Sequence, residues 1–256
     1  MKSEYTLIPV STSQRASPGT QCGGFVSSAI NESGQTLNSN DIVVVTQKIV
    51  SICEGALCVK SKMLLSERAI RMARAVNRDP YAMEAALREA SEVVAEHPVM
   101  IARLRNGIVT DMSGVDVSNA PPDTVVVLPR NPDKSARLIR EHLKNVFGHD
   151  VGVIVSDTQG RPWRKGAANV CIGASGVPLF TVNRGRRDMY GKILRTSLVC
   201  IADEIAAAAE LLMGQAAESV PVVIVRGLDL PPQEQPASSI VRPLAQDLFS
   251  TPNMRQ

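Results

Sequence analysis

An apolar run that ends abruptly in a carboxylate constrains this chain more than any other feature. The run is Val151-Gly-Val-Ile-Val-Ser156, and Asp157 follows it directly. A short run of valine and isoleucine bounded by glycine and proline predicts a buried strand. A turn is predicted immediately afterwards, over residues 158–165. The chain is therefore expected to build a sheet with an acidic side chain at the end of one buried strand.

The predicted turn carries three cationic side chains, Arg161, Arg164 and Lys165. Hard divalent cations prefer oxygen ligands such as the carboxylate of Asp157, and phosphate oxygens bind arginine and lysine. This combination suits a polyphosphate together with its divalent ion. The alternative is that Asp157 caps the turn and the basic residues lie on a solvated surface.

Composition argues against nucleic acid as the partner. The net charge is only +3, and aromatic residues make up 3% of the 256 residues, so base stacking cannot dominate binding. The basic residues are concentrated between Arg161 and Arg195, a stretch with Asp188 as its one acid. Such a stretch is either a solvated face or part of a pocket for an anionic ligand. The 44% of hydrophobic residues suffices for a core.

Cysteine usage and hydropathy indicate the compartment. The five cysteines are odd in number and scattered, and the three histidines are isolated, so we expect buried free thiols rather than a zinc site. The first residues lack the apolar segment of a signal peptide, and no apolar stretch is long enough to span a bilayer. We therefore expect a cytoplasmic protein with no membrane partner.

Periodicity and capping residues predict the remaining elements. Strands are expected at 7–10, 41–51, 125–128 and 219–227, with a hairpin over 99–110 that turns at Asn106-Gly107. Helices are expected at 66–75, 79–95, 131–147 and 196–213. Residues 11–24 are predicted to form a loop. Without repeats or a strong linker, residues 1–256 are expected to form a single domain, or two intertwined lobes, with residues 229–256 as a tail that wraps the surface.

Four groups of polar residues lie at predicted strand ends or in loops, where mixed α/β proteins gather their ligands. They are Gln47-Lys48, Asp116 with Asn119, Asp157-Thr158, and Gly214-Gln215. Asp116 and Asp157 could share a divalent ion if the fold brings them together. In the alternative interpretation, Asp116 stabilises its own turn, Asn119 caps the next segment and Lys48 is exposed.

The usual nucleotide-binding and nucleophile motifs are missing. The Gly185–Lys192 segment has the wrong glycine spacing for a phosphate-binding loop, and Ile193 stands where that loop needs serine or threonine. No histidine lies in a convincing catalytic context. An enzyme with this sequence is expected to act through a metal ion and cationic side chains on phosphate.

Several segments together resemble the coenzyme F420-0:L-glutamate ligases, the F420-0 gamma-glutamyl ligase family. They include Ser156-Asp-Thr-Gln-Gly-Arg-Pro-Trp-Arg-Lys-Gly166, Gly114-Val-Asp-Val-Ser-Asn119 and Arg187-Asp-Met-Tyr-Gly191. Two more are Pro221-Val-Val-Ile-Val-Arg-Gly227 and, near the end, Ile240-Val-Arg-Pro243. The likeness spans about residues 5 to 250 in order, which is far more specific than any single motif.

The resemblance implies an α+β fold with mixed sheets and flanking helices, in a homodimer. It implies a GTP-dependent ligase that joins L-glutamate to the lactyl carboxylate of a deazaflavin coenzyme and then extends a γ-linked tail. The expected route is an acyl phosphate. Mg²⁺ or Mn²⁺ is implied, with K⁺ as a further candidate, and the partners are small-molecule substrates only.

The resemblance also implies roles for particular residues. Asp116 and Asp157 match the first metal site, and Thr158 with Gln215 matches the second. Gln47, Lys48, Asn119 and the Gly214 segment match nucleotide contacts. We further assign Arg161, Arg164 and Lys165 to phosphate, with Asp116, Asp157 and Arg164 as the catalytic group.

The chain departs from the family pattern around the nucleotide and the acceptor. Ile52 replaces a lysine, Met112-Ser113 replaces Asn-Ala, and Gln215 stands where members often carry glutamate. Residues 11–19 also differ from the family's first loop. Two alternatives therefore stay open: a divergent paralogue that joins another acid and amine with GTP or ATP, and a non-catalytic anion-binding homologue.

Overall fold

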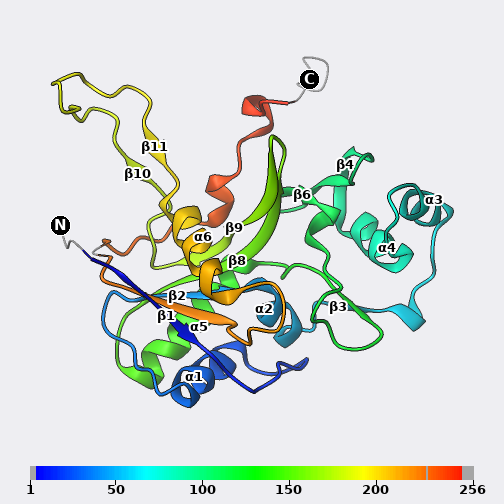
Figure 1. The fold of residues 1–256 in the computed structure, drawn as a ribbon, viewed down its shortest axis with the longest axis horizontal. Helices are drawn as coiled ribbons and strands as arrows, with labels where there is room; N and C mark the ends of the chain where they lie inside the picture. Colours follow the sequence, from blue (N-terminus) through cyan, green and yellow to red (C-terminus); the bar gives the residue numbers. More distant parts are fainter. Residues whose placement is uncertain (1–3, 229, 250–256) are drawn as a thin grey trace.

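A five-stranded sheet forms the centre of the molecule (Figure 1). The computed structural model describes residues 4–228 and 230–249. The strand order is β1-β12-β2-β8-β9, and only β2 and β8 run parallel. Their bounds are β1 Thr6–Val10, β12 Val222–Arg226, β2 Ile42–Thr46, β8 Gly152–Arg161 and β9 Arg164–Ser175. The strands predicted near 7–10 and 219–227 are confirmed.

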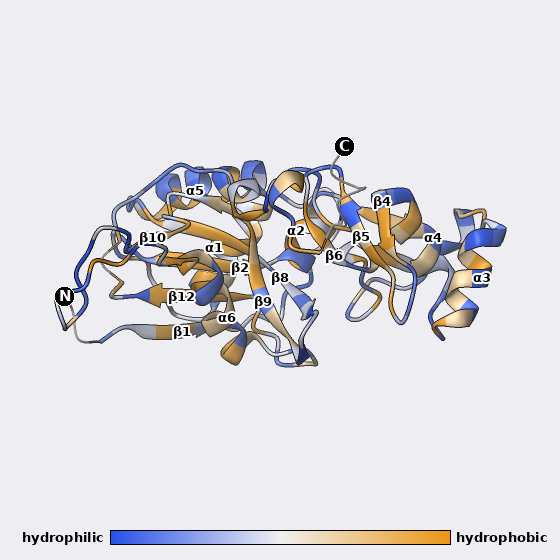
Figure 2. Cartoon of the chain, turned by 90° about the horizontal axis from the view of Figure 1, so that it is seen from above, coloured by the Kyte–Doolittle hydropathy of each residue, from blue (hydrophilic) through white to orange (hydrophobic). Residues whose placement is uncertain are grey.

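Helices cover both faces of this sheet because its strands are apolar on both sides. In β2, Val43 and Val45 pack in one core with α1 (Cys22–Glu32) and α5 (Pro132–Phe147), whereas Ile42 and Val44 pack in another with α6 (Ile201–Met213). This alternation follows from the two-residue period of a strand. Figure 2 shows the strands between α5 and α6.

A third apolar cluster forms a smaller body at one end of the elongated molecule (Figures 1 and 2). It contains α3 (Glu67–Ala75), α4 (Pro80–Glu89) and the sheet β4-β5-β6. These strands span Ala90–Ala95, Ile101–Leu104 and Val109–Asp111, while β3 (Leu57–Val59) pairs with β7 (Thr124–Val126). Four 3₁₀ turns cover Lys60–Lys62, Met112–Gly114, Ala237–Ile240 and Leu244–Gln246.

The capping predictions are confirmed. The Ser66 hydroxyl accepts a hydrogen bond from the Ala69 amide, Asp79 caps α4, and Asn131 caps α5. Gly148 ends α5 in a left-handed conformation. The α+β class with mixed sheets and flanking helices is likewise confirmed.

The predicted strand at 41–51 is wrong in its second half. The strand β2 ends at Thr46, and α2 (Gln47–Cys53) begins at the next residue. The apolar residues Ile49, Val50 and Ile52 continue the β-branched composition, so propensity alone cannot find the boundary. Packing against the core decides it.

The predicted turn directly after Asp157 is also wrong. The strand β8 continues to Arg161 because it pairs with β9, with Asp157 opposite Val170 and Thr158 opposite Asn169. The actual turn is Pro162-Trp163. The predicted turn thus begins several residues too early, because pairing with β9 extends the strand beyond the core.

Three further boundaries differ from the predictions. Residues 22–24 begin α1 instead of extending the loop, and residues 90–95 form β4 instead of the end of a helix. The last long helix begins at Ile201 rather than 196, because β11 (Leu198–Val199) pairs with β10 (Thr181–Val182). At 16 residues, α5 is longer than the 13-residue α6.

None of the helices among the described residues is both long and apolar enough to cross a membrane.

Candidate functional site

The first polar cluster joins α2 to the loop that carries Asp116. The Nζ atom of Lys48 lies 2.8 Å from Oδ2 of Asp116 and donates to the Ser118 carbonyl at 2.7 Å. The Ser118 amide donates to Oδ1 of Asp116 at 2.7 Å. Asp116 thus stabilises its own turn, as the alternative interpretation held, but Lys48 is half-buried rather than exposed.

Lys48 favours the ionised form of Asp116. Burial opposes ionisation of this carboxyl, but the hydrogen bond and positive charge of Lys48, with hydrogen bonds from Ser118, hold its pKa below the usual range. Asp116 is therefore a carboxylate over the physiological pH range, which a cation ligand has to be.

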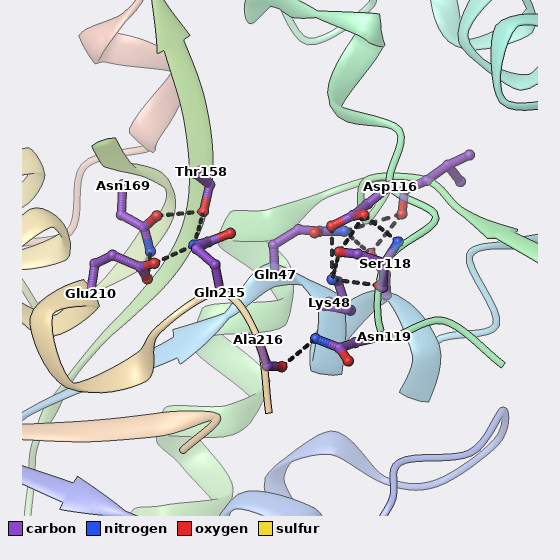
Figure 3. Close-up of polar contacts among 12 residues, drawn as sticks. Gln47, Lys48, Asp116, Ser118, Asn119, Thr158, Asn169, Glu210, Gln215 and Ala216 are labelled. Carbon is purple, nitrogen blue, oxygen red and sulfur yellow. Dashed lines mark hydrogen bonds and ion pairs between the residues drawn. The ribbon is translucent and has the colours of Figure 1, made fainter. Parts of the chain in front are cut away.

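Gln47 and Asn119 lie beside this cluster. Gln47 is 3% exposed, and its amide nitrogen donates to the Ser51 hydroxyl at 2.6 Å. Asn119 has a left-handed backbone, with φ of 48°, and its amide donates to the carbonyl of Ala216 at 2.8 Å. The segment after α6 is thereby tied to the Asp116 loop (Figure 3).

The second polar cluster is a closed ring of four side chains from β8, β9, α6 and the loop after α6. The Thr158 hydroxyl donates to Oδ1 of Asn169 at 2.6 Å, and the Asn169 amide donates to Oε2 of Glu210 at 2.8 Å. The amide nitrogen of Gln215 donates both to Thr158, at 2.9 Å, and to Oε1 of Glu210. Gly214, with a positive φ of 67°, ends α6 and turns the chain toward this ring.

Asp157 lies on β8 next to Thr158, so its side chain points to the opposite face of the strand. Burial raises the pKa of Asp157 to about 7, and the charges of Asp111 and Asp116 add to the rise, although Gln159 and the Thr158 amide oppose it. Three aspartates from β8, β6 and the loop after β6 are therefore within electrostatic range of one another. No cluster of three or more His, Cys, Asp or Glu side chains in residues 4–228 and 230–249 is arranged to hold a metal ion. The predicted cation ligands include only two carboxylates, Asp116 and Asp157.

The predicted phosphate-binding cations lie apart from these clusters. Arg161 uses its guanidinium within its own hairpin, donating to the carbonyls of Lys165 and Gly166. Arg164 and Lys165 are exposed at the same hairpin end. The basic stretch from 161 to 195 is divided between this hairpin and the long β10–β11 connection, so it does not form one continuous surface. The phosphate role of these residues stays a prediction.

Sequence reasoning missed three polar residues of the site: Asp111, Asn169 and Glu210. Asn169 lies opposite Thr158 in the β8–β9 ladder, which only the register reveals. Glu210 is a lone acid within the apolar segment 205–213, a signal that could have been noticed. Among the departures from the family pattern, Ile52 is buried, and the Ser113 hydroxyl donates to the carbonyl of Ala86 at 2.7 Å.

Carboxylates, a lysine and neutral polar side chains from the large sheet, α2, α6 and the loops beside them thus form two neighbouring polar clusters. Comparison with known proteins is more specific. Residues 13–227 match the family F420-0:Gamma-glutamyl ligase. The chain belongs to this family.

Individual relatives cover nearly the whole chain. The coenzyme F420:L-glutamate ligase of Methanopyrus kandleri is 43% identical over 95% of this chain and 96% of its own length. The protein of the same name from Methanothermobacter thermautotrophicus is 40% identical, covering 87% of this chain and 88% of its own. The protein of the same name from Archaeoglobus fulgidus is 36% identical, covering 74% of this chain and 76% of its own length.

Proposed function

We propose that this protein joins L-glutamate to the lactyl carboxylate of coenzyme F420-0 and then adds γ-linked glutamates. The observation that carries the proposal is the 43% identity, over 95% of the chain, to a protein named coenzyme F420:L-glutamate ligase. The polar site supports it, because its acidic and cationic groups come from segments within the matched region, residues 13–227.

The proposed reaction uses GTP to activate the acceptor. A carboxylate oxygen of the acceptor attacks the γ-phosphorus, the bond to the β-phosphate oxygen breaks, and GDP leaves. The glutamate amine then attacks the carbonyl carbon of the acyl phosphate. An amide bond forms, phosphate departs, and the amine proton passes to solvent. The chief contribution of the protein is to hold the reactants close together and correctly oriented for attack.

The residues present fit a divalent cation. Asp116 is ionised, Asp157 lies in a concentration of negative charge, and Thr158 and Gln215 offer neutral oxygen atoms. We propose that the two aspartates hold one Mg²⁺ or Mn²⁺ and that Thr158 and Gln215 hold a second. Bound cations would offset charge on the triphosphate. K⁺ stays a further candidate.

The nucleotide is proposed to contact Gln47, Lys48, Asn119 and Gly214. Lys48 is well placed because its amine is already held at the acidic centre by Asp116. Arg161, Arg164 and Lys165 are proposed to reach the phosphates from the β8–β9 hairpin. A homodimer in the cytoplasm is proposed on the strength of the family resemblance.

One incubation tests the function. The protein is mixed with GTP or ATP, Mn²⁺, L-glutamate and F420-0, and both released phosphate and product mass are followed. We expect a glutamylated product with GTP that depends on all four components, and no product from the Asp157→Asn variant. If phosphate is released only when another acid or amine is supplied, and F420-0 is not glutamylated, the divergent paralogue is favoured instead. Ile52 and the altered first loop point to that alternative.

The role of the hairpin cations has a separate test. Arg164→Ala is expected to weaken GTP binding and turnover without loss of stability, because its side chain is exposed. If Arg164→Ala binds and turns over GTP like the unaltered protein, the phosphate role of Arg164 is wrong. If the unaltered protein turns over neither GTP nor ATP with any acid and amine, the non-catalytic alternative holds.

A further inference from the structure

The ring of Thr158, Asn169, Glu210 and Gln215 has a defined direction of hydrogen bonding. A carboxylate only accepts hydrogen bonds, so Glu210 selects the nitrogen end of each amide that it meets. Asn169 donates to one of its oxygens and Gln215 donates to the other. Both amide groups are therefore oriented by a single acidic side chain.

This orientation leaves two oxygen atoms available on the side away from Glu210. Because the Gln215 nitrogen is held by Glu210 and Thr158, its amide oxygen points toward the gap between the two polar clusters, as Figure 3 shows. The Thr158 hydroxyl gives its hydrogen to Oδ1 of Asn169 and accepts one hydrogen bond from Gln215, which leaves one lone pair. A cation could bind these two oxygen atoms, because the Thr158 hydrogen is directed to Asn169 and the Gln215 amide hydrogens are directed to Thr158 and Glu210.

We propose that Glu210 is a positioning residue for the second cation site, acting through Gln215 and Asn169. The proposal rests on the proposed function, in which Thr158 and Gln215 hold that cation. Glu210 fixes the orientation of both amide groups through these hydrogen bonds. It acts behind the cation ligands, in the way that outer carboxylates orient and strengthen metal ligands elsewhere.

An acid is unfavourable for the helix at this position. Glu210 lies in the last turn of α6, which ends at Met213, and a negative charge there is unfavourable with the helix dipole. The side chain is also partly buried. A neutral or cationic residue would suit this helix end better, so the carboxylate carries a local cost.

The test is Mn²⁺ binding to the whole protein, measured by titration calorimetry and electron paramagnetic resonance, with and without GDP. Asp157→Asn serves as the background in which only the second site is left. In that background, Glu210→Gln is expected to weaken the remaining site about 10- to 100-fold, the range seen for outer-shell partners. Glu204→Gln, an exposed acid on the same helix, makes the same charge change and is expected to alter affinity less than about twofold.

A double-mutant cycle separates positioning from direct ligation. If Glu210 acts through Gln215, Glu210→Gln should have little further effect once Gln215→Ala is present. Fully additive losses, or equal affinities for the Glu210→Gln and Glu204→Gln variants, would overturn the proposal. Glu210→Asp, which still only accepts hydrogen bonds, is expected to retain more affinity than Glu210→Gln, and thermal unfolding of the metal-free variants checks the fold.

The same titration distinguishes failure of this proposal from failure of the proposed function. If Asp157→Asn leaves Mn²⁺ binding unchanged while Glu210→Gln weakens it, the assignment of Asp157 fails and the role of Glu210 stands. If Asp157→Asn removes one ion but Glu210→Gln leaves the other unaffected, only the role of Glu210 fails. If the unaltered protein binds no Mn²⁺ even with GDP, both fail.

Discussion

Asp116 and Asp157 show how the same side chain takes opposite character from its neighbours. Lys48, 2.8 Å away, keeps the pKa of Asp116 low despite burial. Burial, with Asp111 and Asp116 nearby, raises the pKa of Asp157 to about 7. A cation bound between these carboxylates would favour the ionised form of Asp157, whereas Asp116 is ionised without one.

The raised pKa makes metal-free stability depend on pH. Well below pH 3.8, Asp157 is protonated in both the folded and the unfolded state and contributes nothing. As the pH rises from the ordinary value of 3.8 to about 7, the unfolded state ionises first, so the folded protein loses stability, and above about 7 the loss is constant.

Asp157→Asn is therefore expected to be more stable than the unaltered protein at pH 8, with most of that gain lost near pH 4. The gain should be on the order of a few kcal/mol, since one pKa unit corresponds to ~1.4 kcal/mol. Urea unfolding in a chelator at both pH values measures it. Glu141→Gln, an exposed carboxylate on α5, should show no comparable gain. A gain for Asp157→Asn that is equal at both pH values would contradict the shifted pKa.

The two adjacent glycines at the start of α1 have different surroundings. A Cβ atom on Gly23 would lie 2.5 Å from Cβ of His142 on α5, so this glycine allows the two helices to approach. A Cβ on Gly24 would meet Gln21 at an ordinary 3.5 Å. The adjacent pair resembles a loop in sequence, yet one member is needed for close helix packing.

Alanine at these two positions should therefore have opposite effects on the free energy of unfolding. Gly23→Ala is expected to destabilise by ~1–3 kcal/mol, the usual cost of overpacking. Gly24→Ala should be neutral or stabilising by up to ~1 kcal/mol, as glycine to alanine is within helices. Denaturant unfolding of both variants gives the comparison, and similar changes in both would mean that the α1–α5 contact does not limit side-chain size.

The C-terminal tail joins parts of the molecule that are distant in sequence. Oδ1 of Asp133, at the start of α5, accepts hydrogen bonds from the amides of Ala174 on β9 and Ala237 in the tail, each at 2.9 Å. Arg103 on β5 pairs with Asp247 at 3.1 Å. The tail thus contacts both the large sheet and the smaller body. The prediction that residues 229–256 wrap the surface stays a prediction, since 229 and 250–256 lie outside the described residues.

Asp133→Ala should loosen the tail from the sheet. Two backbone amides lose a charged acceptor, so we expect a destabilisation of about 2 kcal/mol and faster proteolytic cleavage within residues 230–249. Glu141→Ala removes an exposed carboxylate from the same helix and is the matched control. Limited proteolysis followed by mass spectrometry locates the cuts. Equal cleavage rates in both variants would show that Asp133 does not anchor the tail.

The sequence by itself determined the apolar strands, the helix caps at Ser66, Asp79 and Asn131, and the polar residues placed at element ends, because these depend on neighbours within a few positions. Tertiary packing alone decided that Gln47 begins a helix, that β8 continues past Asp157, and that Asn169 and Glu210 join Thr158 and Gln215. The reason is physical: strand pairing, helix contact and side-chain burial depend on residues that are distant in the sequence, such as Val45 and Val222, which local preference cannot encode.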